Sequence, residues 1–190
     1  MSRIKIAPND SGTGIFTIES PNSNTNRTIT LPDNAGNFLT TGSAGAILQV
    51  KSAFKDDTAT TTSTSFADIS GLSVTITPSS ATNKFLILVT LGSVGNQTNT
   101  VLFNIVRDST AIAQPGGGTA PASINEYQGG GSNGDVDTCS INFLDSPATA
   151  SAITYKVQWR VDNGTGYLNR HTGNSNYRAV SNIVVMEVVA

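Results

Sequence analysis

The second half of the chain is dominated by apolar residues that recur at every second position, which is the spacing of a β-strand with one buried face. The clearest case is TYKVQWRV over Thr154–Val161, where aromatic and β-branched residues alternate with Lys, Gln and Arg. One face of this strand is predicted to be buried and the other to be wet. No stretch shows the 3.6-residue spacing of an amphipathic helix, so we predict an all-β protein.

Runs of this kind, bounded by turn residues, predict about eight strands. They cover residues 47–54, 66–77, 85–91, 101–107, 124–127, 138–144, 153–161 and 183–189. Asn163–Gly164, directly after one of them, is a pair typical of hairpin turns. Eight antiparallel strands are the number of a jelly-roll β-sandwich, which we predict for the second part of the chain.

The run Phe85–Val89 contains no polar position. A strand of an antiparallel sheet that is apolar on both sides must be covered on both sides. In a sandwich of two layers the core covers one side, and another subunit is the natural cover for the other. We therefore expect Leu86 and Leu88 to form a subunit interface. The alternative is that a loop or the N-terminal segment covers this face within one chain.

Residues 1–44 follow a different pattern, in which short apolar pairs alternate with turns such as Pro32–Gly36. The apolar positions are Phe16, Ile18, Ile29, Leu31 and Phe38. Strands this short bury too little surface to be stable alone, so they must pack on partner chains or on their own domain. We place a domain boundary near Gly45, between this segment and the sandwich over residues 45–190.

Composition narrows the classes of partner. Only 13% of the residues are charged and the net charge is −2, which provides no electrostatic field to hold nucleic acid or an anionic membrane surface. The chain has no run of eighteen apolar residues and no apolar stretch near its start. We therefore expect a soluble protein, made in a cytoplasm, that neither inserts into membranes nor binds nucleic acid.

The sequence contains one histidine, His171, and one cysteine, Cys139. A catalytic triad or a zinc site would depend on these single side chains, although each needs several groups of this kind. We predict a solvated loop for the histidine and a place in the apolar core for the cysteine. The chain is therefore expected not to be an enzyme and to hold no metal or cofactor.

The stretch TITLPDNAGNFLTTG over Thr28–Gly42 resembles the TLPDxxGTLLTTG segments of phage tail-fibre and virion structural proteins. Three later stretches, VRDST, FLDSP and ITYKVQ, and the ending VMEV are similar to the C-terminal domains of tail-fibre-like proteins of marine and cyanobacterial phages. The resemblance implies a homotrimeric fibre or knob of the virion, assembled in the bacterial host cytoplasm. It implies that the N-terminal apolar positions attach the chain to the virion, and that Leu86 and Leu88 lie at the trimer interface.

Two functions fit this resemblance. In the first, the N-terminal segment binds other tail or capsid proteins, and loops of the knob bind a host cell-surface glycan or protein. The loop residues expected to bind are Tyr167, Arg170, His171 and Tyr177, because Tyr and Arg provide large contact areas or bidentate hydrogen bonds. In the alternative, the trimer is a capsid or tail decoration protein that stabilises the virion without recognising a receptor. The short N-terminal segment, where tail fibres carry a long shaft, favours this alternative. A virion hydrolase is a third hypothesis and ranks last.

Overall fold

The structure is a computed structural model. It describes residues 11–15, 17, 19, 22–26, 28, 44–96, 99–118, 120–127 and 136–190. The chain divides into two units, Met1–Asn37 and Phe38–Ala190. In the first unit the described residues are exposed, and none of them belongs to a strand. The predicted virion-attachment residues Phe16, Ile18, Ile29, Leu31 and Phe38 lie outside the described residues, and the predicted boundary near Gly45 stays a prediction.

The described part of the second unit forms eleven strands. They are β1 (Ile47–Lys55), β2 (Ala59–Thr61), β3 (Ala67–Ile76), β4 (Lys84–Asn96), β5 (Thr100–Arg107), β6 (Thr110–Ile112), β7 (Ile124–Tyr127), β8 (Asp137–Asp145), β9 (Ile153–Val161), β10 (Gly166–Leu168) and β11 (Ser181–Val188). All eight predicted strands are present. The three strands that the sequence did not predict, β2, β6 and β10, are three residues long and are too short to show an alternating pattern.

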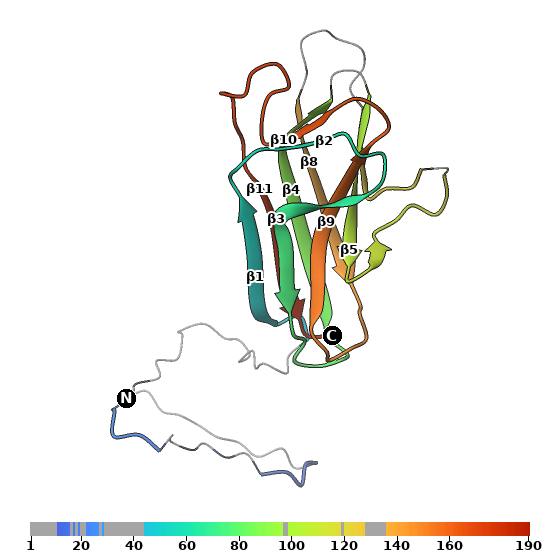
Figure 1. Cartoon of the computed structure of the whole chain (residues 1–190). Coiled ribbons are helices and arrows are strands. Elements are labelled where there is room, and N and C mark those ends of the chain that lie inside the picture. The colour runs from blue at the N-terminus through green and yellow to red at the C-terminus, as the bar shows by residue number, and fades with distance from the viewer. Residues whose placement is uncertain are drawn as a thin grey trace. The chain divides into compact units, whose positions relative to one another are not determined.

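The strands form two antiparallel sheets that pack face to face (Figure 1). In one layer the order is β1-β11-β4-β8, and β10 and β2 continue it beside the last residues of β4. In the other layer the order is β3-β9-β5, with β6 and β7 both pairing with β5. The antiparallel sandwich predicted from the sequence is confirmed, and the order of the eight longer strands is that of a jelly roll.

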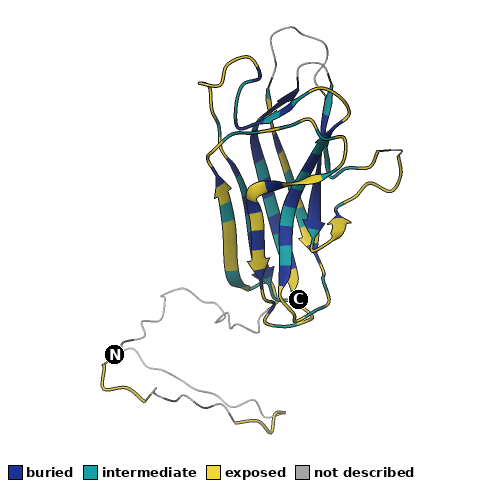
Figure 2. Cartoon of the chain, viewed as in Figure 1, coloured by how far each residue is buried: buried dark blue, intermediate teal, exposed yellow. Residues whose placement is uncertain are grey.

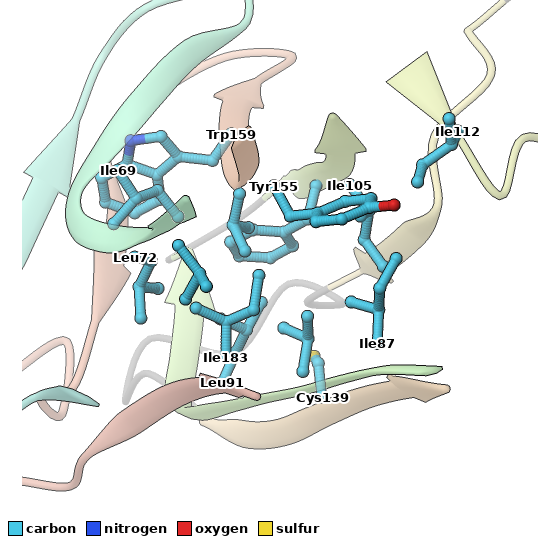
Figure 3. Packing of buried hydrophobic residues seen from close by; sticks show 14 of the residues in the cluster. Ile69, Leu72, Ile87, Leu91, Ile105, Ile112, Cys139, Tyr155, Trp159 and Ile183 are labelled. Carbon is cyan, nitrogen blue, oxygen red and sulfur yellow. The ribbon is translucent and has the colours of Figure 1, made fainter. Parts of the chain in front are cut away.

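The core lies between the two layers and is formed by the inward-facing residue of each alternating pair (Figures 2 and 3). In β9 the burial alternates along the whole strand, as its sequence predicts. Aromatic rings join the layers and the strands. Phe85 and Tyr155 lie 5.9 Å apart between centroids, and Phe103 stacks on Trp159 at 6.3 Å. Cys139 belongs to the same apolar cluster, as predicted.

A buried polar group ties the two layers together near one end of the sandwich. Asp145 of β8 accepts a hydrogen bond of 2.7 Å from the Tyr155 hydroxyl and forms an ion pair of 2.7 Å with Arg107. Burial, followed by the hydrogen bond to Asp145, raises the pKa of Tyr155 above its ordinary value. The hydroxyl therefore stays a donor, and β8 of one layer is linked at this point to β5 and β9 of the other.

The two ends of the sandwich differ in what they carry. At one end the chain enters β1 and leaves β11, where Gly45 N donates to Val189 O at 2.9 Å and Val189 N donates to Ala46 O at 3.0 Å. At the opposite end lie residues 162–165 and the loop between β10 and β11 (Figure 1). The prediction of a hairpin at Asn163–Gly164 is wrong, because β9 and β10 belong to different layers and the turn crosses between them.

Candidate assembly face and candidate binding loop

An apolar row crosses the outer face of the β1-β11-β4-β8 layer. Its members are cross-strand partners in register: Val50 with Met186, Met186 with Leu86, and Leu86 with Leu144. We call these four residues the apolar row. They alternate along their strands with residues that face inward, such as Ile87 and Val185, and so they point away from the core. Val50 is 53% exposed and Leu144 is 51% exposed.

Leu86 and Leu88, the predicted interface residues, both lie on this outer face and are partly exposed in the single chain. Leu88 pairs with Val184 of β11 on one side and with Asn142 of β8 on the other. The outer face is thus apolar around the two leucines and becomes polar at the next position of β8. The threefold assembly itself stays a prediction.

Glu187 lies on the inner side of β11, next in the chain to Met186 of the apolar row, and is fully buried. Its carboxylate accepts hydrogen bonds from Asn83 Nδ2 at 2.7 Å, Gln49 Nε2 at 2.6 Å and Ser79 N at 2.7 Å. Burial alone would raise the pKa of Glu187, but these hydrogen bonds outweigh it and hold the pKa below its usual value. The charged form therefore anchors β1 and the β3–β4 connection to β11.

The four predicted receptor-binding residues all lie in or beside the loop between β10 and β11. Tyr167 belongs to β10, and its ring lies under the Arg170 guanidinium, 5.1 Å from centroid to Cζ. The rings of His171 and Tyr177 meet edge to face at 6.1 Å. The structure thus places the four side chains in two contacting pairs, at the end opposite to the one where the chain enters β1.

The base of this loop is held by a buried hydrogen-bond network centred on Asn169. Its side-chain nitrogen donates to Lys55 O and Asp57 O, both at 2.9 Å, and its side-chain oxygen accepts from Ser181 Oγ at 2.6 Å. Ser181 Oγ in turn accepts from Gly92 N at 3.0 Å. Asn169 has a φ of 60°, a left-handed conformation that Asn tolerates better than most residues. The loop therefore starts from a fixed position.

Sequence reasoning missed four residues of these two regions. Val50, Met186 and Leu144 complete the apolar row, but only the register of the strands brings them beside Leu86. Arg178 pairs across the loop with Arg170. The sequence does hold one signal for the loop, because no acidic residue occurs between Asp162 and Glu187 although the stretch contains both arginines and His171.

The described residues offer little for catalytic chemistry. Burial, reinforced by the nearby Glu126 carboxylate, raises the pKa of Cys139 to about 12, so its thiol stays protonated and is a poor nucleophile. Nowhere in the described ranges do three or more His, Cys, Asp or Glu side chains gather to hold a metal ion. The same part of the chain forms no helix that could cross a membrane.

No protein-family model and no curated protein matches this chain. Among solved structures it is similar to a chain in the structure of infectious bursal disease virus, Gt strain. The identity is 14% and the TM-score is 0.39, over 82% of this chain and 42% of that one. It is also similar to the VP2 subviral particle of the same virus, with 13% identity and a TM-score of 0.35 over 75% of this chain and 37% of that one. The chain spans less than half of these structures. The jelly-roll fold is defined by the strand order of the two sheets.

Proposed function

We propose that this chain is a non-enzymatic structural protein of a bacteriophage virion, a homotrimeric fibre or knob that binds the particle through its N-terminal segment. The observation that carries the proposal is the apolar row on the outer face of the β1-β11-β4-β8 layer. The resemblance of Thr28–Gly42 to phage virion segments supports the location in the particle.

The apolar row needs a cover. Burying a Leu, Val or Met side chain that is otherwise in water contributes about 1.5 to 3 kcal/mol, so a row of four partly exposed ones favours association. Leu86 and Leu88 stand at the centre of this face, between β11 and β8. In the proposed trimer, three copies pack these faces around a common axis and shield them from water.

The polarity of the sandwich supports a distal knob. The chain enters β1 beside the last residues of β11, while the β10–β11 loop lies at the other end. A segment that holds the virion at the first end leaves this loop pointing away from the particle. The loops of the distal end, with Tyr167, Arg170, His171 and Tyr177, are then free to bind a host surface glycan or protein.

The second candidate is a capsid or tail decoration protein that stabilises the virion without recognising a receptor. The observation in its favour is that every described residue of Met1–Asn37 is exposed in the single chain. An exposed segment of this kind can add a strand to a neighbouring sheet, with alternate apolar side chains such as Phe16 and Ile18 filling pockets.

The first experiment is the mass of the full-length chain in solution, measured by light scattering. One chain has a mass of 19.7 kDa, and the proposal predicts three times that value. Sedimentation with purified virions and with intact host cells then separates the two candidates. A knob binds both, whereas a decoration protein binds virions only. A monomer that binds neither virions nor cells would overturn the proposal.

A further inference from the structure

We propose that the β10–β11 loop is a binding site for an acidic glycan, held by Arg170 and Arg178 with Tyr177 beside them. This inference rests on the proposed function, since it names the class of ligand that the distal loop of the knob would take. It is carried by the charge, the free donors and the fixed geometry of the loop.

The two arginines face each other across the loop. Arg170 and Arg178 form an antiparallel bridge, so their Cβ atoms lie roughly 5 Å apart and their side chains leave the same face. Like charges directly opposite on paired strands are destabilising. Neither arginine forms an ion pair with any described carboxylate, and all four ion pairs of the described residues are made by other groups. The loop thus holds an excess of positive charge within a chain of net charge −2.

Both guanidinium groups are oriented by the loop and still have donors to offer. Arg170 Nε donates to His171 O and Arg178 Nε donates to Ser175 O, each at 3.2 Å. A guanidinium has five N–H donors, and within the described residues no acceptor is assigned to the terminal nitrogens of either arginine. Each of these forks matches the oxygens of a carboxylate, sulfate or phosphate group.

The loop is preorganised, which lowers the cost of binding. Beyond the Asn169 network at its base, His171 N donates to Tyr177 O at 3.0 Å and Ala179 N donates to Asn169 O at 3.1 Å. Gly173 N donates to His171 Nδ1 at 3.1 Å, so Nδ1 is the acceptor and Nε2 is left as the ring's donor. His171, next in the chain to Arg170, therefore adds a further donor to the loop.

The neighbouring side chains favour a sugar as the bearer of the acidic group. Tyr177 is 67% exposed and offers a ring and a hydroxyl beside His171. The tip of the loop, Gly173–Asn176, is exposed and carries Asn and Ser side chains that can bond to hydroxyl groups. A long polyanion such as nucleic acid would extend beyond the loop and meet the net negative charge of the rest of the chain, whereas a short acidic oligosaccharide would not.

Calorimetric titration of the full-length chain tests the site. The probes are tetragalacturonate, the neutral maltotetraose of the same length, and a single-stranded DNA oligonucleotide. The acidic tetrasaccharide is expected to bind, more weakly at high salt, and the neutral one is not. Each of Arg170→Gln and Arg178→Gln should weaken binding about tenfold or more, because each removes hydrogen bonds to a charged group.

The matched control is Lys51→Gln, which removes the same single charge from an exposed position outside the loop and should bind like the parent. Thermal unfolding checks folding independently, since Arg178→Gln removes a like-charge contact and should not lower the melting temperature. Unchanged affinity in both arginine variants, equal binding of maltotetraose, or tighter binding of the DNA would overturn the inference. A trimer that binds virions but not the acidic sugar would overturn this inference alone and leave the proposed function standing.

Discussion

The two outer faces of the sandwich differ in the polarity of their outward-facing side chains. On the β3-β9-β5 layer, Asp68 forms an ion pair with Lys156 at 2.8 Å and accepts a hydrogen bond from Gln158 at 2.7 Å. Arg160 lies over the Phe66 ring at 5.4 Å and pairs with Asp162. On the opposite layer the corresponding positions are the apolar row. One outer face thus carries charged and polar side chains, and the other carries the apolar row.

The β3-β9-β5 layer also contains apolar residues that point outward and are nevertheless buried within the single chain. Leu102 and Val106 point outward from β5, yet they are only 1% and 2% exposed. The segment after β6 returns to this strand, where Gln114 donates to the Asn104 side chain at 3.2 Å. Leu86 and Leu88 on β4 remain partly exposed in the described structure. The two leucines are therefore the positions that the proposed trimer would cover.

The largest expected effect follows from placing a charge at the centre of the apolar row. Leu86→Asp should abolish assembly, because an unpaired carboxylate buried in an interface costs several kcal/mol. Light scattering should then give the mass of one chain in place of three. Ser73→Asp is the control, since it adds the same charge at an exposed position of β3 opposite Lys156 and should leave the mass unchanged.

Two results would contradict this comparison of the faces. A parent chain that is already a monomer, with Leu86→Asp lowering its melting temperature, would mean that the outer face is covered within one chain. Equal loss of assembly in Ser73→Asp would place the interface on the polar layer.

The second prediction separates the outer side of β11 from its inner side. Glu187→Gln should lower stability by about 2 to 3 kcal/mol, because the donors of Asn83, Gln49 and Ser79 lose the charged acceptor that Glu187 provides inside the fold. For a domain of this size the melting temperature should fall by about 5 to 10 °C. The mass of the assembly should not change while the chain is folded. Asp56→Asn, which alters an exposed acid, is the control.

The same carboxylate predicts a dependence of stability on pH. Since the pKa of Glu187 is lower in the folded chain than its ordinary value, its contribution is fully present above the unfolded pKa of about 4.3 and is lost as pH falls through the folded pKa. Chemical unfolding measured between neutral pH and pH of about 3 should show this loss in the parent and less of it in Glu187→Gln. Equal acid sensitivity of the two proteins would contradict the assignment.

The sequence predicts the strands well because alternation is a local property. The strand Thr154–Val161 and the apolar run Phe85–Val89 lie where their patterns indicate, and both predicted interface leucines point outward. What could not be predicted depends on pairing between distant residues. No local pattern shows that Val50 and Leu144 line up with Leu86, or that the turn at Asn163–Gly164 crosses between layers. The sequence likewise does not show that Arg178 lies opposite Arg170, which is the reason to include it in the proposed site.

A smaller effect is expected at the two ends of the apolar row. Val50→Ser and Leu144→Ser should each weaken assembly by about 1 to 2 kcal/mol, or roughly tenfold in the dissociation constant, because about half of each side chain is already covered in the single chain. Dilution series in the light-scattering instrument should show dissociation at higher concentrations than for the parent. Loss of assembly as complete as in Leu86→Asp would mean that the row is not centred on β4.

The smallest effect on stability is expected on the polar outer face of the β3-β9-β5 layer. Asp68→Asn removes the ion pair with Lys156, and exposed pairs contribute less than about 1 kcal/mol. The hydrogen bonds from Lys156 and then Gln158 lower the pKa of Asp68, so what stabilisation there is exists above the ordinary pKa of Asp and fades as pH falls below it. The melting temperature should fall by no more than about 4 °C at low salt, and the difference from the parent should shrink at high salt. A fall in melting temperature as large as that of Glu187→Gln, or any change in the mass of the assembly, would show that the polar face contributes to stability or to assembly. The contrast between the two faces would then fail.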